Sequence, residues 1–235
     1  MIKTAIVTGA SRGLGRALAF QLASAGVRVV LVARESLELR QAASELRARG
    51  AEAHPLAADL GDKHAIYQIA GAASALVGPV DLVIHNASTL GPTPLPLLLD
   101  TECEDLERVL AVNLLGPFRL SKALAGQMAL RGQGTLVHIS SDAATSAYPG
   151  WGAYGVSKAA LDQLARSWAV ELDELGVKVV SIDPGEMDTA MHAAALPEAD
   201  RKSLADPAEV ARRIVQIIFE QRFKNGARLT LGGES

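Results

Sequence analysis

The sequence predicts an α/β fold, in which a doubly wound parallel sheet of about seven strands is flanked by helices. Short runs rich in β-branched residues alternate along the chain with longer runs rich in Ala and Leu. Several short runs are almost wholly apolar, as at 29–32 (VVLV) and 81–84 (DLVI), which is typical of strands buried on both faces. No repeat or Ser/Gly linker divides the 235 residues. We therefore expect a single domain, 1–235.

Seven strands and at least seven helical stretches are expected in alternating order. Two helical runs are followed by Gly26 and Gly50, and Asp206 precedes Pro207 at the start of the last run, which are common helix-end signals. The expected strands are Lys3–Thr8, Val27–Val32, Ala51–Ala57, Asp81–His85, Gly134–Ser140, Val177–Asp183 and Arg228–Leu231. The expected helices are Leu14–Ala25, Ser36–Arg49, Lys63–Val77, Ala153–Leu175 and Pro207–Gln221, with two or more shorter helical stretches across Thr101–Leu130.

The composition excludes several classes of protein. A net charge of −3 argues against a nucleic-acid partner, which would call for a strongly basic surface. Cys103, the single cysteine, excludes an internal disulfide framework. The histidines 54, 64 and 138 lack metal-ligand spacing, so no catalytic metal is expected. No apolar run is long enough for a membrane span, and the chain opens directly into a strand, so we expect a cytoplasmic location and no membrane partner.

Two proline-containing stretches interrupt the alternation of strands and helices. Leu90–Pro96 follows the fourth expected strand, and Glu186–Asp206 follows the sixth. In a doubly wound sheet both leave the carboxyl edge, where ligands bind. We expect these two loops to line a pocket, and the second to become ordered on binding.

A glycine-rich turn follows the first strand. Gly9, Gly13 and Gly15 are spaced GxxxGxG, which differs from the common GxGxxG fingerprint. Glycines permit a tight turn and a close approach of the backbone to a ligand. The helix that follows offers unpaired N–H groups to a pyrophosphate. The turn therefore predicts a Rossmann-type dinucleotide site.

The end of the second strand indicates which dinucleotide binds. An acidic residue there would bind the ribose 2′-hydroxyl of NAD(H), but Ala33 and Arg34 occupy this place, and Arg12 lies in the glycine turn. Two guanidinium groups suit a 2′-phosphate, so NADP(H) is favoured over NAD(H). The alternative is that Arg34 pairs with Glu38 on a solvated helix.

Tyr154 and Lys158 share one face of a helix, because they are four residues apart. A free phenol has a pKa of about 10, too high for proton transfer near neutrality. An ammonium about 5 Å away would favour the phenolate by roughly 3 kcal/mol at an effective dielectric of about 20. The pair therefore predicts a proton-transferring tyrosine whose pKa is lowered by the lysine. A surface helix pair is the alternative.

Two further polar residues fit this chemistry. Ser141, at the end of the fifth strand, can hold a substrate carbonyl while the phenol protonates it, although a Ser-Ser-Asp run is also common in turns. Asn113 lies within a helical stretch, where Asn is disfavoured, and its apolar neighbours suggest a partly buried place.

Taken together, these motifs resemble the short-chain dehydrogenase/reductase family in its single-domain branch. The resemblance runs from Thr8 to about Leu231 and covers TGASRGLG (8–15), the acidic-apolar pair Asp59-Leu60, and the PGxxxT segment 184–189. Asn113, Ser141, Tyr154 and Lys158 match the family's catalytic tetrad. HNAS (85–88) departs at both ends from the family's NNAG, so only its central Asn86 and the adjoining Ala87 are carried over.

The resemblance implies reversible hydride transfer between nicotinamide C4 and a carbonyl or alcohol carbon of a small molecule. Tyr154 would protonate the oxygen, Ser141 orient it, Lys158 bind the nicotinamide ribose, and Asn113 support a water relay. With NADP(H) preferred, carbonyl reduction is the expected direction. The residues expected to bind the cofactor are Gly9, Ser11, Arg12, Gly13, Leu14, Gly15, Arg34, Asp59, Leu60, Asn86, Ala87, Tyr154, Lys158, Pro184, Gly185, Met187 and Thr189.

Three other functions remain open at this point. One is a 3-oxoacyl-carrier-protein reductase, which needs a basic patch near the site that Arg131, Arg201 and Lys202 would supply. The second is a non-enzymatic NADP(H)-binding regulator. The third is an isomerase or dehydratase that uses Asp142 or Glu186.

The expected substrate side is apolar. Trp151 is the strongest candidate lining residue, while His192 is expected to face solvent. The resemblance also implies a homodimer or homotetramer. The other candidate lining residues are Leu90, Pro92, Leu95, Ala143, Tyr148, Met187 and Met191.

Overall fold

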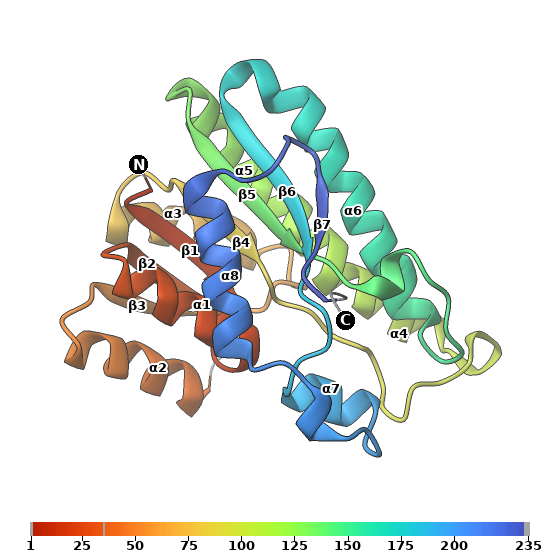
Figure 1. Ribbon diagram of the computed structural model, residues 1–235. Helices are drawn as coiled ribbons and strands as arrows, with labels where there is room; N and C mark the ends of the chain where they lie inside the picture. The colour runs from red at the N-terminus through yellow and green to blue at the C-terminus, as the bar shows by residue number, and fades with distance from the viewer. Residues whose placement is uncertain (1, 35, 233–235) are drawn as a thin grey trace.

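The predicted sheet is present in the computed structural model, which describes residues 2–34 and 36–232 (Figure 1). Seven parallel strands lie in the order β3-β2-β1-β4-β5-β6-β7. The chain winds from β1 to one edge and then returns to build the other half from β4. The strands are β1 (Thr4–Thr8), β2 (Arg28–Ala33), β3 (Ala53–Ala57), β4 (Leu82–His85), β5 (Gly134–Ile139), β6 (Val177–Asp183) and β7 (Arg228–Thr230).

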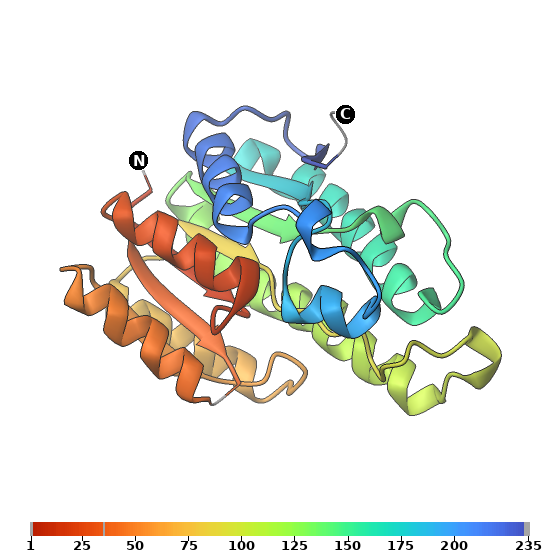
Figure 2. The ribbon, with the colours of Figure 1, turned by 60° about the horizontal axis from the view of Figure 1, so that its bottom comes forward.

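Three long helices cover each face of the sheet (Figures 1 and 2). One layer consists of α1 (Gly13–Ser24), α2 (Leu37–Ala48) and α8 (Pro207–Glu220), and the other of α3 (Ala65–Val77), α5 (Gly116–Leu130) and α6 (Gly152–Leu172). The remaining helical segments are the 3-10 turns Leu98–Asp100, Asp142–Ala144, Asp173–Leu175 and Arg201–Ser203, the helices α4 (Cys103–Leu110) and α7 (Ala190–Ala195), and the π-helical turn Ala111–Leu115.

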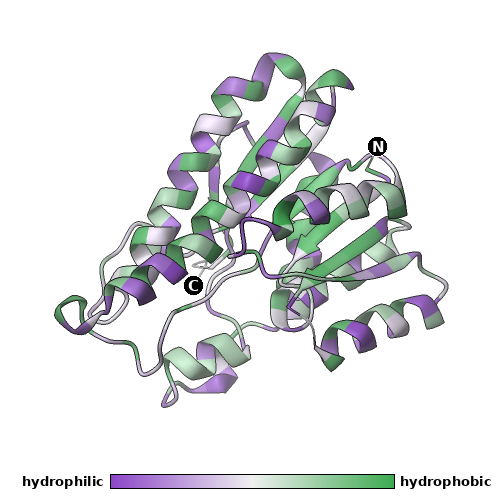
Figure 3. Ribbon diagram, turned by 180° about the vertical axis from the view of Figure 1, so that it is seen from behind, coloured by the Kyte–Doolittle hydropathy of each residue, from purple (hydrophilic) through white to green (hydrophobic). Residues whose placement is uncertain are grey.

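Two apolar cores, one on each side of the sheet, explain why the strands are apolar throughout. Successive residues of β1 alternate between them: Ala5 and Val7 join the core under α1 and α8, and Ile6 joins the core under α3, α5 and α6. The strands are accordingly coloured mostly as hydrophobic, while the helices mix hydrophobic and hydrophilic residues (Figure 3). A fully buried aliphatic side chain contributes roughly 1.5–3 kcal/mol.

The predicted helix ends are confirmed. Gly26 and Gly50 follow α1 and α2 with φ of 79° and 83°, which glycine adopts without steric cost. Asp206 caps α8 because its Oδ1 accepts a hydrogen bond from the N–H of Ala208 at 2.9 Å.

Two stretches differ from the expectation. Thr101–Leu130 contains α4, the π-helical turn and α5, so Asn113 lies where the helix is locally widened. Residues 186–206 are not a plain loop, because Thr189 caps α7 there. Among the described residues no helix is both long and apolar enough to cross a membrane.

Candidate active site

A cleft of about 1790 Å³ lies at the carboxyl ends of the strands, between the glycine turn and α7. It forms where β1 and β4 lead the chain in opposite directions, as doubly wound sheets do. The structure brings all the predicted site residues to this cleft except Asn113, which lies behind it. The residues at the cleft are Gly9, Ser11, Arg12, Gly13, Leu14, Gly15, Arg34, Asp59, Leu60, Asn86, Ala87, Ser141, Tyr154, Lys158, Pro184, Gly185, Met187 and Thr189.

The glycine turn leaves room for a ligand against the backbone. Gly9 and Gly13 have φ of 67° and 53°, and a Cβ on Gly15 would lie 2.2 Å from the Gly9 carbonyl oxygen. Arg12, the N-cap of α1, makes no side-chain capping bond, and the first turn holds no acidic residue. The free N–H groups of this helix end therefore suit a pyrophosphate.

Asn86 fastens the glycine turn to the end of β4. Its Nδ2 donates to the Thr8 carbonyl oxygen at 2.9 Å and to that of Gly9 at 3.4 Å. The Thr8 hydroxyl in turn accepts from the N–H groups of Asn86 and Ala87, both at 3.0 Å. These contacts brace the glycine turn against the end of β4.

Two exposed guanidinium groups lie at the far end of the cleft. Arg34 directly follows β2, and Arg12 lies across from it in the glycine turn. No ion pair joins Arg34 to Glu38 within residues 2–34 and 36–232, so that alternative has no support. The pKa of Glu38 is lowered by a hydrogen bond from its own backbone, by Ser36 and by Arg12.

Asp59 is held by a residue that the sequence motifs did not reveal. Its carboxylate accepts hydrogen bonds from the Gly61 N–H at 2.8 Å and from Arg108 at 2.6 Å. Burial acts to raise the pKa of Asp59, but these two partners together lower it below its usual value. Arg108 lies on α4, far along the chain, and no local motif pointed to it.

Tyr154 and Lys158 lie side by side on α6, as predicted. Both are buried, and the Lys158 Nζ is 5.4 Å from the centre of the Tyr154 ring. Lys158 also donates to the Ile139 carbonyl oxygen at 2.8 Å, which anchors it to the end of β5. The lysine is thus fixed beside the phenol by the sheet itself.

The predicted effect of Lys158 on the phenol is wrong for the protein alone. Burial raises the pKa of Tyr154 to about 12, although the Ser141 and Ser88 hydroxyls oppose this shift. Burial also lowers the pKa of Lys158 to about 8. The loss of water around the buried phenol is the largest cause of this shift, and the spacing of the two residues does not disclose burial.

Asn113 is buried in the π-helical turn. Its amide accepts from the Thr89 N–H at 2.8 Å and donates to the Thr89 carbonyl oxygen and to the Ser157 hydroxyl, both at 2.9 Å. Ser157 donates to the Tyr154 carbonyl oxygen at 2.6 Å. Asn113 therefore joins the loop after β4 to the first turns of α6.

Ser141 begins the 3-10 turn that follows β5. Its hydroxyl donates to Asp142 at 2.9 Å and accepts from the Ala143 N–H at 3.2 Å. The second oxygen of Asp142 accepts from the Tyr148 hydroxyl at 2.9 Å. Asp142 is thus held within its own turn by these contacts.

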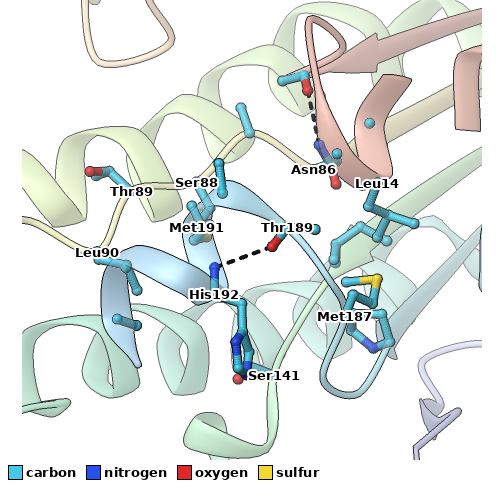
Figure 4. Close-up of a pocket in the computed structure, with 18 of the residues that line it drawn as sticks. Leu14, Asn86, Ser88, Thr89, Leu90, Ser141, Met187, Thr189, Met191 and His192 are labelled. Carbon is cyan, nitrogen blue, oxygen red and sulfur yellow. Dashed lines mark hydrogen bonds between the residues drawn. The ribbon is translucent and has the colours of Figure 1, made fainter. Parts of the chain in front are cut away.

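The substrate side of the cleft is largely apolar. The Trp151 ring meets the Tyr154 ring edge-on, with centres 5.6 Å apart. Leu90, on the loop after β4, and Met191, on α7, belong to the same apolar cluster as these two rings and also line the cleft (Figure 4). The other candidates divide into two groups. Tyr148 and Met187 line the cleft, whereas Pro92, Leu95 and Ala143 do not.

His192 does not face solvent as expected. Its side chain is 12% exposed, and it lines the cleft from α7 (Figure 4). The Nε2 atom lies 3.7 Å from the Glu186 carboxylate. The backbone N–H of His192 donates to the Thr189 hydroxyl at 3.2 Å, which places the PGxxxT segment at the start of α7.

His85, where the motif departs from NNAG, forms a buried pair with His138. Their rings stack with centres 4.7 Å apart, and His85 Nε2 lies 2.8 Å from the Ser121 hydroxyl. Burial lowers the pKa of His138 to about 3, so the pair is neutral near pH 7. Within the described ranges no three His, Cys, Asp or Glu side chains come together as a metal site.

Comparisons with known proteins agree with this geometry. Residues 3–200 match the short chain dehydrogenase family. The chain belongs to the short-chain dehydrogenase/reductase family. It is a dehydrogenase/reductase that acts on a CH–OH or C=O group of a small molecule.

Three relatives illustrate the range of the family. Carbonyl reductase [NADPH] 2 of Sus scrofa is 37% identical over 211 residues, which are 89% of this chain and 78% of that protein. A variant of actinorhodin polyketide ketoreductase with NADPH has a TM-score of 0.89 at 27% identity, covering 98% of this chain and 95% of the other. NAD+-bound xylitol dehydrogenase has a TM-score of 0.87 at 26% identity, covering 98% of both chains. Relatives therefore bind either coenzyme.

Proposed function

We propose that this protein, as a single domain spanning residues 1–235, is an NADP(H)-dependent reductase of an apolar ketone or aldehyde. One observation carries the proposal: Ser141, Tyr154 and Lys158 meet in the same cleft as an uncapped helix end and two exposed arginines. The apolar side chains around Tyr154 select an uncharged carbonyl compound. The Sus scrofa relative, a carbonyl reductase that uses NADPH, supports this substrate class.

The cleft residues fit the coenzyme. The open N–H groups of α1 would hold the pyrophosphate, Asp59 and Leu60 the adenine, and Arg12 and Arg34 the 2′-phosphate. The segment 184–189 would hold the carboxamide through Pro184, Gly185, Met187 and Thr189. When bound, NADP(H) supplies the hydride at nicotinamide C4.

The chain's own side chains then handle the proton and the oxygen. Tyr154 donates a proton to the substrate oxygen, and Ser141 donates a hydrogen bond to the same oxygen as charge develops there. Lys158 binds the nicotinamide ribose beside the phenol, and Asn113 supports the relay that returns a proton to Lys158. A phenol whose pKa is raised to about 12 starts protonated near pH 7, as the reduction direction requires.

The alternative function as a 3-oxoacyl-carrier-protein reductase lacks its basic patch. Arg131 donates to the Val80 carbonyl oxygen at 2.5 Å and lies 3.8 Å from Asp81, just before β4 at the amino edge of the sheet. Arg201 lies near the cleft, at the carboxyl edge, where it pairs with Asp188. Arg131 therefore lies at the opposite edge of the sheet from Arg201 and its neighbour Lys202.

We also propose that copies of the chain associate through α5 and α6, in a dimer or tetramer. Phe118, Val156 and Val170 on these helices are 36%, 54% and 81% exposed. Light scattering measures this directly, and a monomeric mass at micromolar concentration would contradict it. A cytoplasmic location is part of the same proposal.

The proposed reaction is tested by NADPH oxidation with a panel of ketones, aldehydes and diketones. The wild-type protein is expected to reduce at least one apolar ketone, and Tyr154→Phe to lose roughly 10²–10⁴-fold in kcat while still binding NADPH. Tyr67→Phe, at an exposed position on α3, is the matched control and should match the wild type. No turnover across the panel, or equal rates in Tyr154→Phe, would refute the proposal.

A further inference from the structure

A buried ion cluster lies behind the catalytic side chains. Arg228, the first residue of β7, reaches from its Nε to Asp162 at 3.0 Å and from one terminal nitrogen to Asp183 at 2.9 Å. The same terminal nitrogen donates to the Ser141 carbonyl oxygen at 2.8 Å. One guanidinium therefore contacts α6, β6 and the turn after β5.

The fold brings these groups together from distant parts of the chain. Arg228 pairs in register with Ser181, two residues before Asp183 in β6, so the two side chains leave the same face of the sheet. Asp162 follows Lys158 by one turn on α6, on the same helix face. Three elements therefore converge beside Lys158.

The two carboxylates depend on Arg228. The side chains of Asp162 and Asp183 are only 4% and 5% exposed. Among residues 2–34 and 36–232 no other Lys or Arg pairs with either carboxylate, and Asp162 Oδ1 accepts no hydrogen bond. Buried carboxylates without a cation are strongly disfavoured, so the arginine holds both in their places.

The cluster also connects two segments of the proposed active site. Asp183 Oδ1 accepts from the Gly185 N–H at 3.1 Å, at the start of the PGxxxT segment. Its other oxygen binds Arg228, which binds the Ser141 backbone. A shift of this guanidinium would move both segments together.

We propose that Arg228 is a positioning residue, which fixes the Ser141 backbone and holds the carboxylates of Asp162 and Asp183 beside Lys158. Its catalytic consequence rests on the proposed function of Ser141 and Lys158. The cluster itself stands on contacts that do not involve the coenzyme.

The charges around Lys158 give the proposal a distinctive signature. Burial lowers the pKa of Lys158, and Asp162 on α6 and Asp183 on β6 oppose that shift. His138 on β5 and Tyr154 on α6 are the other titratable groups that face it, and Asp142 lies farther off, beyond the phenol. Arg228 offsets the two carboxylates. Loss of Arg228 with both carboxylates still charged and in place raises the pKa of Lys158, and neutralising Asp183 lowers it.

The direct test follows the titration of Lys158 by NMR of side-chain ¹⁵N-labelled lysine in the full chain, with Lys158→Arg to assign the signal. Arg228→Gln should raise the midpoint by about one pH unit and Asp183→Asn should lower it by a similar amount. Arg213→Gln is the matched control, since within residues 2–34 and 36–232 the one side-chain hydrogen bond of Arg213 goes to the Leu231 carbonyl oxygen at 3.2 Å, outside the cluster. It should leave the midpoint unchanged.

A merely structural Arg228 would leave the Arg228→Gln midpoint in place or lower it together with the Asp183→Asn midpoint, and either result would overturn the proposal. If circular dichroism shows that Arg228→Gln does not fold, the Lys158 midpoints of Arg228→Lys and Asp183→Asn test the proposal instead. Arg228→Lys keeps the positive charge but replaces the planar guanidinium with an ammonium. It should therefore return the Lys158 midpoint to within about half a unit of the wild type.

Kinetics separate this proposal from the proposed function. With the best ketone of the panel, Arg228→Gln should lower kcat roughly 10- to 100-fold while KM changes less than about 2-fold. Arg228→Lys should recover little of the lost kcat. An unchanged kcat in Arg228→Gln would overturn the positioning part. If wild type reduces no carbonyl, the proposed function fails, and the NMR midpoints still decide the charge cluster.

Discussion

Tyr154 illustrates what single residues disclose and what they conceal. The four-residue spacing from Lys158 was enough to predict that the two side chains share a helix face, and they do. The spacing carries no information about burial, so the sign of the pKa shift of the phenol was predicted wrongly. The role of Arg228 was not predicted either, because its partners in the ion cluster lie 45 to 87 positions away.

Arg34 supports a prediction about coenzyme choice. Arg34→Ala removes a cation from the cleft at the place proposed for the 2′-phosphate. It should raise the Kd of NADPH roughly 10-fold or more and leave the Kd of NADH within about 2-fold. Fluorescence titration with each coenzyme measures this.

Arg166→Ala is the control for Arg34→Ala, because Arg166 is exposed on α6 and, in the part of the chain that the structure describes, its side chain hydrogen-bonds to Gln163 alone. It should change neither Kd. Equal affinity of the wild type for both coenzymes would contradict the preference for NADP(H).

Lys158 supports a prediction about stability and pH in the protein without coenzyme. Its pKa falls from 10.5 to about 8 on folding. The unfolded chain therefore holds more protons between these values, and stability rises as pH rises from 8 towards 10. Tyr154, raised from 10.0 to about 12, acts oppositely only above pH 10. Urea unfolding at pH 8 and 10 should show a rise of a few kcal/mol.

Lys158→Met should lack most of this rise, because it has no ammonium to bury. Lys63→Met, at an exposed position, should retain it. A rise of equal size in Lys158→Met would show that Lys158 is not the group responsible.

At the scale of elements, the sequence predicted the strands well because their apolar runs are buried on both faces. It did not predict α7, whose six residues carry too weak a periodicity to stand out from a loop. The sequence predicted that Asn113 lies in a helical stretch, but it did not predict the π-helical turn, in which Asn113 contacts Thr89 and Ser157. The prediction that His192 faces solvent was wrong because α7, the helix that places His192 in the cleft, was not predicted.

The junction of β1 and α1 supports a prediction about packing. Gly15→Ala would place a Cβ 2.2 Å from the Gly9 carbonyl oxygen, so the turn must open. We expect a loss of roughly 1–3 kcal/mol in unfolding free energy and much weaker NADPH binding. Thermal unfolding and fluorescence titration measure the two effects.

Gly71→Ala is the matched control, because a Cβ at this position in α3 meets nothing within 4 Å. It should be neutral or stabilise by about 0.5–1 kcal/mol. Similar results for the two variants would show that the turn tolerates a side chain, and that close packing against Gly9 does not require glycine at position 15.

At the scale of the whole molecule, the position of the cleft follows from topology. The glycine turn belongs to the half that contains β1 to β3, and Ser141, Tyr154 and Lys158 belong to the half that begins with β4. The order of the strands and of the motifs along the chain was enough to predict that the glycine turn and these three side chains face one another across the cleft. The detailed shape of the substrate side was not predictable, because Pro92, Leu95 and Ala143 differ from Leu90 only in where the fold directs them.

The central claim is that Tyr154 protonates a carbonyl while a hydride reaches its carbon from NADPH in this cleft. The most direct measurement is the mass of the alcohol formed from a ketone with NADPH that carries two deuterium atoms at nicotinamide C4. The wild type should give an alcohol with one deuterium on the carbinol carbon, and Tyr154→Phe should give almost none in the same time. An unlabelled alcohol, or equal yields of labelled alcohol from both proteins, would contradict this mechanism.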